Sequence, residues 1–197
     1  MTIRPRTENR KNRVRDVLAR RQKDITLVVN NIHDPHNVSA ILRSCDAFGI
    51  SAVHLLYTSN VFPALGKKSS ASAKKWVGRI NHTDAAAMKQ VLDEQGFTLV
   101  RTGFSSTAVA LKDWDFTRPT AVILGNEHSG VEKDLQDLVD NELYIPMQGM
   151  VQSLNVSVAA AIILYEAFRQ RHEAGLYSTP SLSEPEIEKY FQQWIEK

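Results

Sequence analysis

The segment "YIPMQGMVQSLNVSVAAAIILYEAFRQR", residues 144–171, decides the fold of this chain. It reads as the end of a strand, a turn at a glycine and then a long apolar helix. A helix that only fills a core needs one polar cap, but this helix begins with both Ser153 and Asn155. We therefore expect the start of the helix to build a ligand site as well as a core.

Predicted strands and helices alternate along the rest of the chain. Apolar runs predict strands at residues 25–32, 51–57, around 76–80, 97–103, 120–125 and 142–147. Helical spacing predicts helices at residues 37–49, 83–96 and 131–140, the first capped by Asn37 and the second by Thr83 or Asp84, with residues 58–75 as a loop. Most of these strands are continuous apolar runs, which indicates an α/β fold with a mainly parallel sheet and helices on both faces.

The composition is typical of a globular protein with one domain and short appendages. The chain has 197 residues, of which 43% are hydrophobic and 23% are charged. We expect a basic helical arm at residues 1–23, a sheet domain at 24–175 and a helical tail at 176–197. The longest apolar run, residues 156–165, is too short to span a bilayer, and the N-terminus lacks an apolar secretory segment.

The content of cysteine and histidine argues against disulfides and metal sites. Cys45 is the only cysteine, so an internal disulfide is excluded, and a reducing cytoplasm is the expected compartment. Cys45 itself is expected to be a core thiol. His33, Asp34 and His36 stand close together, but no further ligands follow at metal-site spacing, so we expect no metal.

Basic residues gather in two places. Residues 1–23 contain nine Lys or Arg and two acids, and residues 66–79 contain five cations and no acid. Such clusters are solvated surface segments or bind a polyanion, and two of them in one small chain favour nucleic acid. The tail differs, because residues 173–197 contain five acids and two lysines. We expect the tail to pack on the body or on a second subunit and not to grip RNA.

Glycine-rich segments follow three of the predicted strands, at residues 101–106, 124–131 and 145–155. In α/β sheets ligands bind beyond the carboxyl ends of the strands, and glycine lets the backbone approach them. Gly125 and Gly130 have the spacing of a phosphate-binding loop, but the lysine and hydroxyl residues of that loop are missing. A ligand held by backbone groups, with methionine and leucine around its apolar parts, is therefore expected.

Three stretches carry a family resemblance. They are "NNIHDPHNVSAILRSCDAFGI" (30–50), "AVILGNEHSGV" (121–131) and "YIPMQGMVQSLNVSVAAAIILYE" (144–166). In this order they resemble the three motifs of the SpoU class of SPOUT RNA 2′-O-methyltransferases. The stretches 18–50 and 149–177 are similar to the TrmH type, which methylates the ribose of guanosine 18 in the tRNA D-loop.

The resemblance implies a sheet domain that ends in a trefoil knot, and a cytoplasmic homodimer that acts on tRNA without a metal or a membrane. It implies S-adenosylmethionine as the methyl donor and S-adenosylhomocysteine as the product. The implied catalytic residues are Arg43, Asn37, Glu127, Ser153 and Asn155. The implied cofactor-binding residues are Thr102, Leu124, Gly125, Gly130, Ile145, Pro146, Met147 and Leu154. The implied RNA-binding residues are Arg10, Arg13, Arg20, Arg21, Lys74, Lys75, Arg169 and Arg171.

The resemblance assigns Arg43 to the reacting hydroxyl, and two roles stay open for it. It either takes the proton of the ribose 2′-hydroxyl or clamps the adjacent phosphate and stabilises the developing alkoxide. Asn37 is expected to orient the arginine or the hydroxyl, unless it only caps a helix. Ser153 and Asn155 are expected to position the substrate. Glu127 either shapes the site or caps the turn that follows it.

Other functions remain open from the sequence alone. Within the same class, the target is another tRNA position, such as the wobble ribose, or a site in ribosomal RNA. A non-catalytic RNA-binding protein with this fold is a second reading, and it leaves the five catalytic candidates without a role. A sugar- or nucleotide-binding α/β enzyme is a third, and it leaves the basic arm unexplained.

Overall fold

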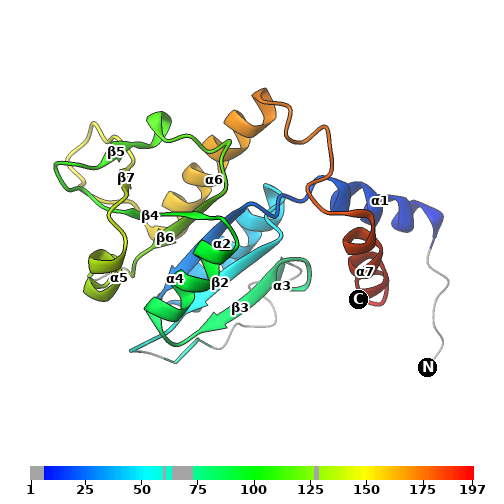
Figure 1. The fold of residues 1–197 in the computed structure, drawn as a ribbon, viewed down its shortest axis with the longest axis horizontal. Coiled ribbons are helices and arrows are strands. Elements are labelled where there is room, and N and C mark those ends of the chain that lie inside the picture. The colour runs from blue at the N-terminus through cyan, green and yellow to red at the C-terminus, as the bar shows by residue number, and fades with distance from the viewer. Residues whose placement is uncertain (1–6, 60, 64–72, 127–128) are drawn as a thin grey trace.

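The computed structural model describes residues 7–59, 61–63, 73–126 and 129–197, which form an α/β fold around one parallel sheet (Figure 1). The strand order is β3-β2-β1-β6-β4-β7-β5, and each neighbouring pair is parallel. The strands are β1 (Ile25–Asn30), β2 (Ala52–Leu56), β3 (Gly78–His82), β4 (Thr98–Thr102), β5 (Val109–Ala110), β6 (Thr120–Leu124) and β7 (Glu142–Tyr144).

Helices cover both faces of the sheet, as the alternation of strands and helices predicted. Helices α2 and α6 pack against each other on one face, and α4 and α5 pack together on the other. The helices are α1 (Glu8–Ala19), α2 (Pro35–Ala47), α3 (Ala73–Trp76), α4 (Ala85–Glu94), α5 (Lys133–Leu138), α6 (Val156–Glu173) and α7 (Glu184–Ile195), with a 3-10 helix η1 at Leu111–Asp113.

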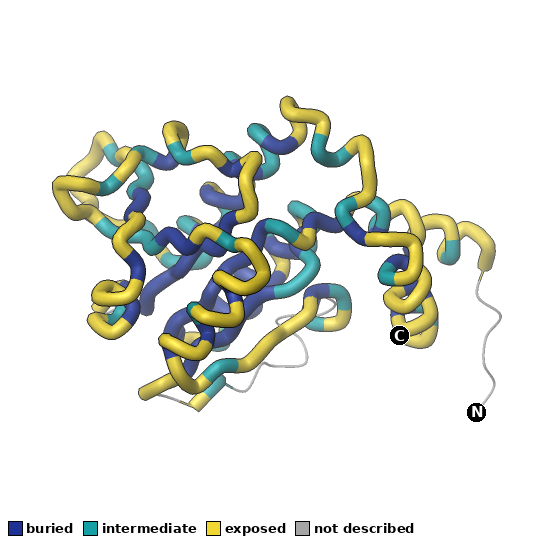
Figure 2. Tube along the Cα trace, in the orientation of Figure 1, coloured by how far each residue is buried: buried dark blue, intermediate teal, exposed yellow. Residues whose placement is uncertain are grey.

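The central strands are buried from both sides, which explains why they read as continuous apolar runs (Figure 2). Successive side chains of a strand point to opposite faces. Leu27 and Val29 of β1 accordingly join the core under α2 and α6, whereas Val28 joins the core under α4 with Met88. Each strand of this kind contributes to two cores at once.

The two ends of the chain meet in a third, smaller core. Helices α1 and α7 lie side by side at one end of the molecule (Figure 1), and the apolar side chains of Leu18, Phe191 and Trp194 are buried between them. The tail therefore packs on the N-terminal arm and, through Trp194 against Trp76, on the sheet domain. The expectation was that it packs on the body or on a second subunit. The division into three parts and the trefoil knot stay predictions.

Three local predictions were wrong. Asn37 does not cap its helix, because α2 begins at Pro35 and the Asp34 carboxylate accepts the N–H of His36 at 2.8 Å. Proline suits the first turn of a helix, where its missing N–H is not needed, and this moves the start forward. Residues 73–75, predicted as loop, belong to α3, and the short strand β5 had no counterpart in the prediction.

Other helix ends are as predicted. The Asp84 carboxylate caps α4 by accepting the N–H of Ala87 at 2.7 Å, and Gly49 and Gly96, with φ of +79° and +81°, follow the ends of α2 and α4. Among the described residues we find no helix with the length and apolar character that a bilayer span requires.

Candidate active site

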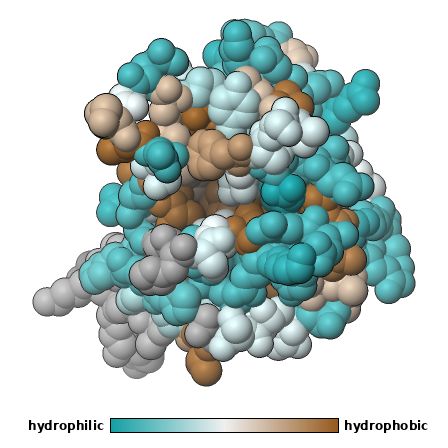
Figure 3. Space-filling view, turned by 90° about the vertical axis from the view of Figure 1, so that its left-hand side faces the viewer, coloured by the Kyte–Doolittle hydropathy of each residue, from teal (hydrophilic) through white to brown (hydrophobic). Residues whose placement is uncertain are grey.

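A cavity of about 800 Å³ lies at the carboxyl ends of β4, β6 and β7. Its walls come from residues 101–105, 124–126, 129–131 and 142–145, from Met147 and from the start of α6. Figure 3 looks onto this side of the molecule and shows an apolar hollow bordered by hydrophilic residues. The three glycine-rich segments thus meet where the sequence placed a ligand site.

The wall after β6 is a backbone turn that only glycine can form. The N–H of Asn126 donates to the Gly130 carbonyl at 2.9 Å, and the Gly130 N–H donates back to the Asn126 carbonyl at 3.1 Å. Gly130 has a φ of +70°, and a Cβ on Gly125 would overlap the backbone of Gly130. The backbone of this turn is therefore bare toward the cavity.

A buried carboxylate holds the wall after β4. Glu142 is buried, forms an ion pair with Arg101, and accepts the N–H of Ser105 at 2.7 Å. The Gly103 N–H donates to the Leu143 carbonyl at 3.0 Å, which ties this turn to β7. The sequence prediction missed Arg101 and Glu142, because they stand 41 positions apart by residue number and only the pairing of β4 with β7 brings them together.

The start of α6 explains its two polar residues. Asn155 caps the helix, since its Oδ1 accepts the N–H of Ser157 at 2.8 Å and the hydroxyl of Ser157 at 2.6 Å. Its Nδ2 donates to Oδ1 of Asn37 at 3.1 Å, which joins α6 to α2. Ser153 is exposed and lines the cavity. One polar residue therefore organises the backbone and the other faces the ligand space.

The catalytic candidates are only partly brought together. Ser153 and Asn155 line the cavity, and Asn37 reaches it through its bond with Asn155. Arg43 is exposed on α2, does not line the cavity and makes no hydrogen bond to another described residue. Glu127 lies outside the described residues.

The predicted cofactor residues lie almost entirely around this cavity. Pro146 alone among them is not part of the described lining. The residues that do line it are Thr102, Leu124, Gly125, Gly130, Ile145, Met147 and Leu154.

The predicted RNA contacts fall into two groups. Arg10, Arg13, Arg20 and Lys75 are exposed and Lys74 is half-buried, so their charges reach the surface. Arg169 also lies at the surface, but its guanidinium is paired with Glu166 at 2.7 Å and with Glu173 at 2.8 Å.

Arg21 and Arg171 correct the sequence prediction, because each is only 1% exposed. Arg21 pairs with Asp46 and donates to the Ile50 carbonyl at 2.8 Å. Arg171 donates to the Asp24 carboxylate at 2.5 Å and to the Phe116 carbonyl at 3.0 Å, and it also bonds the Gln22 amide. Both guanidinium groups are used inside the fold and are not available to grip the surface of an RNA.

Known proteins are similar to this chain in sequence and in fold. The model of the SpoU rRNA Methylase family matches residues 24–165. The tRNA (guanosine(18)-2'-O)-methyltransferase of Thermus thermophilus is 45% identical over 99% of this chain and 100% of its own length. The enzyme of the same name from Aquifex aeolicus is 42% identical over 95% of this chain and 89% of its own length.

Solved structures of related proteins are also similar to this chain. The A. aeolicus TrmH/SpoU tRNA modifying enzyme matches with a TM-score of 0.89 at 40% identity, over 96% of both chains. The SpoU methyltransferase AviRb from Streptomyces viridochromogenes, solved with the cofactor AdoMet, matches with a TM-score of 0.67 at 27% identity, over 77% of this chain and 62% of that one. From its sequence motifs, its parallel sheet and these matches, this chain belongs to the SpoU rRNA methylase family.

Proposed function

We propose that this protein transfers the methyl group of S-adenosylmethionine to the ribose 2′-hydroxyl of guanosine 18 in tRNA. The observation that carries the proposal is the cavity at the carboxyl ends of β4, β6 and β7, built from glycine turns and bordered by Ser153 and Asn155. Full-length relatives at 45% and 42% identity bear the name of this activity. The 23S rRNA (guanosine-2'-O-)-methyltransferase RlmB of Vibrio parahaemolyticus is less similar, at 35% identity over 81% of this chain, which favours tRNA over ribosomal RNA.

The cavity fits the methyl donor. Its volume of about 800 Å³ lies within the usual range of cofactor sites. Because Gly125 and Gly130 have no side chains, an adenosyl moiety can approach the backbone of this wall closely, and apolar side chains lie around it. We assign the donor to the lining residues Thr102, Leu124, Gly125, Gly130, Ile145, Met147 and Leu154, with Pro146 next to them. When bound, the donor supplies an electrophilic methyl group on a sulfonium.

The protein has to hold the 2′-oxygen close to that methyl group and in line with the bond that breaks, and correct placement supplies much of the rate. Ser153 faces the cavity and is placed to bond the ribose. Asn155 is committed to its cap and to Asn37, so both asparagines fix the helix start that carries Ser153. We assign to Glu127, in the second motif, a role in shaping the active site.

Arg43 acts on the hydroxyl in this proposal. A guanidinium keeps its proton at neutral pH and is a poor base. Arg43 is therefore better suited to stabilising the developing alkoxide and clamping the neighbouring phosphate than to taking the proton. Arg43 does not line the cavity of its own chain, so a second copy is needed to bring an arginine to each site.

A homodimer through α6 supplies that second copy. Val158, Ile162 and Tyr165 follow each other at helical spacing on α6 and are all exposed, and Met150 in the preceding loop is 98% exposed. An apolar stripe of this kind on a globular protein marks an interaction surface. The stripe runs along the helix that packs against α2, which carries Arg43.

We also propose a cytoplasmic location, where the tRNA substrate is found.

The test is methyl transfer from labelled S-adenosylmethionine to an unmodified tRNA transcript, with the modified nucleotide mapped. Label at guanosine 18 is expected, with a loss of about 100-fold or more in Arg43→Ala because a group that stabilises the transition state is removed. Arg118→Ala, which removes an exposed arginine paired with Asp115, is the matched control and should act like the wild type.

Two outcomes would contradict the proposal. Label at another ribose would keep the enzyme class and refute guanosine 18. Tight tRNA binding without any label would support a non-catalytic RNA-binding protein. Sedimentation of the same samples reports the dimer, and a monomer that retains full activity would refute the shared site.

A further inference from the structure

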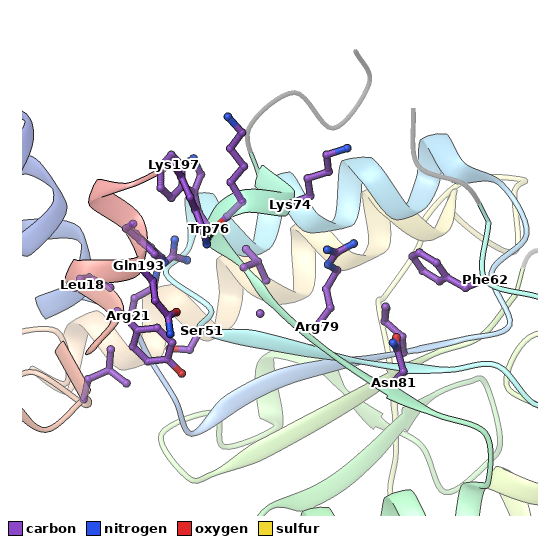
Figure 4. Close-up of a pocket in the computed structure, with 17 residues that line it drawn as sticks. Leu18, Arg21, Ser51, Phe62, Lys74, Trp76, Arg79, Asn81, Gln193 and Lys197 are labelled. Atoms are coloured by element: carbon purple, nitrogen blue, oxygen red, sulfur yellow. Dashed lines mark hydrogen bonds between the residues drawn. The ribbon is translucent and has the colours of Figure 1, made fainter. Parts of the chain in front are cut away.

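A second cavity, of about 410 Å³, lies along the β3 edge of the sheet (Figure 4). Its walls are β2 and β3 from their amino ends as far as Leu55 and Asn81, Phe62 after β2, the short helix α3, and residues of α1 and α7. Among the described residues it shares no lining residue with the cavity at the ends of β4, β6 and β7, and β1 lies between the strands that line the two cavities. It is therefore not a part of the candidate active site.

The lining of this cavity is strongly cationic. Lys74 and Lys75 on α3, Arg79 on β3 and Lys197 after α7 line it, and among the described residues no acidic side chain does. The Nζ of Lys197 donates to the Lys75 carbonyl at 2.5 Å. Burial and the nearby charge of Lys75 lower the pKa of Lys197, as expected where cations crowd without an anion. The end of the tail therefore brings a cation to the cavity, although the tail as a whole is acidic.

Aromatic rings stand among these cations. The centroids of the Trp76 and Trp194 rings are 5.0 Å apart at 57°, and Tyr190 lines the same cavity. The Nζ of Lys197 lies 6.0 Å from the centre of the Trp76 ring. Figure 4 shows Trp76 and Lys74 on one side of the space, Gln193 and Lys197 from the tail beside them, and Arg79 pointing across it. Aromatic faces within a cationic groove are the means by which proteins hold single-stranded nucleic acid.

We propose that this cavity binds one nucleotide of the tRNA substrate, with its phosphate among Lys74, Lys75, Arg79 and Lys197 and its base beside Trp76. The inference rests on the proposed function and adds a second anchoring point to it, distant from the reacting ribose. A tRNA is large enough to reach both ends of the sheet. Arg13 on α1 and Arg20 just after it are also exposed, and α1 lines the cavity through Leu18.

The test compares tRNA binding by the full-length protein and two charge-matched double variants. Lys74→Gln with Lys75→Gln removes two cavity cations, while the Lys197 bond to the Lys75 backbone carbonyl is kept. Lys89→Gln with Lys112→Gln removes two cations from α4 and η1 as the control. We expect the first pair to weaken tRNA binding about tenfold and to lower the slope of log affinity against log salt by about two. Binding of S-adenosylmethionine should not change.

Two single variants test the aromatic part. Trp76→Leu should weaken tRNA binding several-fold and Trp76→Phe should restore most of it, since a phenyl ring still offers a face to a base. Thermal unfolding of each variant separates this effect from a loss of the core between α1 and α7. A Trp76→Leu variant that folds and binds tRNA like the wild type would remove the base from the proposal.

The remaining outcomes decide between sources of the ligand and between the two proposals. If the lysine pair binds and methylates tRNA like the control pair, the cavity does not serve tRNA. If guanosine monophosphate or inorganic phosphate binds at micromolar concentration without competing with tRNA, the cavity serves a small ligand and the inference is wrong. If the wild type methylates no RNA but the lysine pair still weakens tRNA binding, the proposed function fails and the cavity assignment holds.

Discussion

The two cavities lie in opposite halves of one parallel sheet, and one is formed mainly by backbone and the other mainly by side chains. At the carboxyl ends of β4, β6 and β7, glycine turns leave the backbone uncovered, and the walls are held by hydrogen bonds within the chain. Along β2 and β3, long cationic and aromatic side chains form the walls. Where a wall is made of closely packed backbone, as at Gly125, an added Cβ would collide with it. A wall made of side chains can tolerate the substitution of a single residue.

The amino ends of β1 and β6 are joined by a buried polar network, and breaking it should have the largest effect. Arg171 on α6 joins Gln22 and Asp24, before β1, to the carbonyl of Phe116, before β6. We expect Arg171→Met to lower the free energy of unfolding by about 2–5 kcal/mol, because the buried oxygen of Gln22 and the buried carbonyl of Phe116 would both lose their donor, at about 1–3 kcal/mol each. Chemical denaturation measures this directly.

Arg169 is the matched control, two positions earlier on the same helix. Its guanidinium is paired with Glu166 and Glu173 at the surface. Arg169→Met should cost less than about 1 kcal/mol, as exposed ion pairs contribute little. Equal losses in the two variants would mean that the buried network does not hold the amino ends of the strands together.

The cavity at the carboxyl ends of β4, β6 and β7 should be sensitive to a substitution that displaces its backbone. In Gly125→Ala the new Cβ overlaps the backbone of Gly130, so the turn has to move. We expect methyl transfer to fall about 100-fold, as a displacement of about 1 Å at a reacting site can cost this much. Affinity for S-adenosylmethionine, measured by calorimetry, should fall with it.

Gly149→Ala is the control for this change, because a Cβ at Gly149 meets no atom within 4 Å. It lies in the loop before α6 and should act within about twofold of the wild type, as surface substitutions usually do. A Gly125→Ala variant with full cofactor affinity would show that the cavity wall adapts, and the contrast between the two cavities would then lose its main support.

The sequence predicted the sheet and the place of the first cavity, because both depend on local patterns. Continuous apolar runs mark strands buried on two faces, and glycine-rich segments mark their carboxyl ends. The prediction failed where a residue's surroundings come from distant parts of the chain. Arg21 and Arg171 look like surface cations until the packing of α1, α6 and α7 buries them. The strand β5 has two residues, too few for any periodicity.

The second cavity shows the same limit. Lys74 and Lys75 were recognised as cations in a basic stretch, but their neighbours Gln193, Trp194 and Lys197 stand more than 115 positions away. The acidic composition of the tail concealed the side of α7 that faces the cavity. Charge counted along a segment averages over its faces, whereas a binding surface uses only one of them.

The smallest predicted effect concerns acid, and it separates the two halves of the sheet. His54 on β2 and His82 on β3 stack in the half of the sheet that carries the second cavity, with Nδ1 of His54 2.9 Å from Nε2 of His82. Burial, followed by the charge of His82, lowers the pKa of His54 from 6.5 to about 4. Between these values the unfolded chain binds more protons than the folded one, so stability is complete above pH 6.5 and falls as the pH falls toward 4.

Between pH 6.5 and 4.5 this residue should remove about 2 kcal/mol of the free energy of unfolding. His54→Gln keeps a hydrogen-bonding group beside His82 but does not titrate, so its stability should fall less over the same range. His172→Gln, at an exposed position on α6, is the control and should fall as the wild type does. Urea denaturation at the two pH values measures the difference. If His54→Gln loses as much stability in acid as the wild type, the acid sensitivity comes from carboxylates elsewhere, and the stacked pair does not distinguish this half of the sheet.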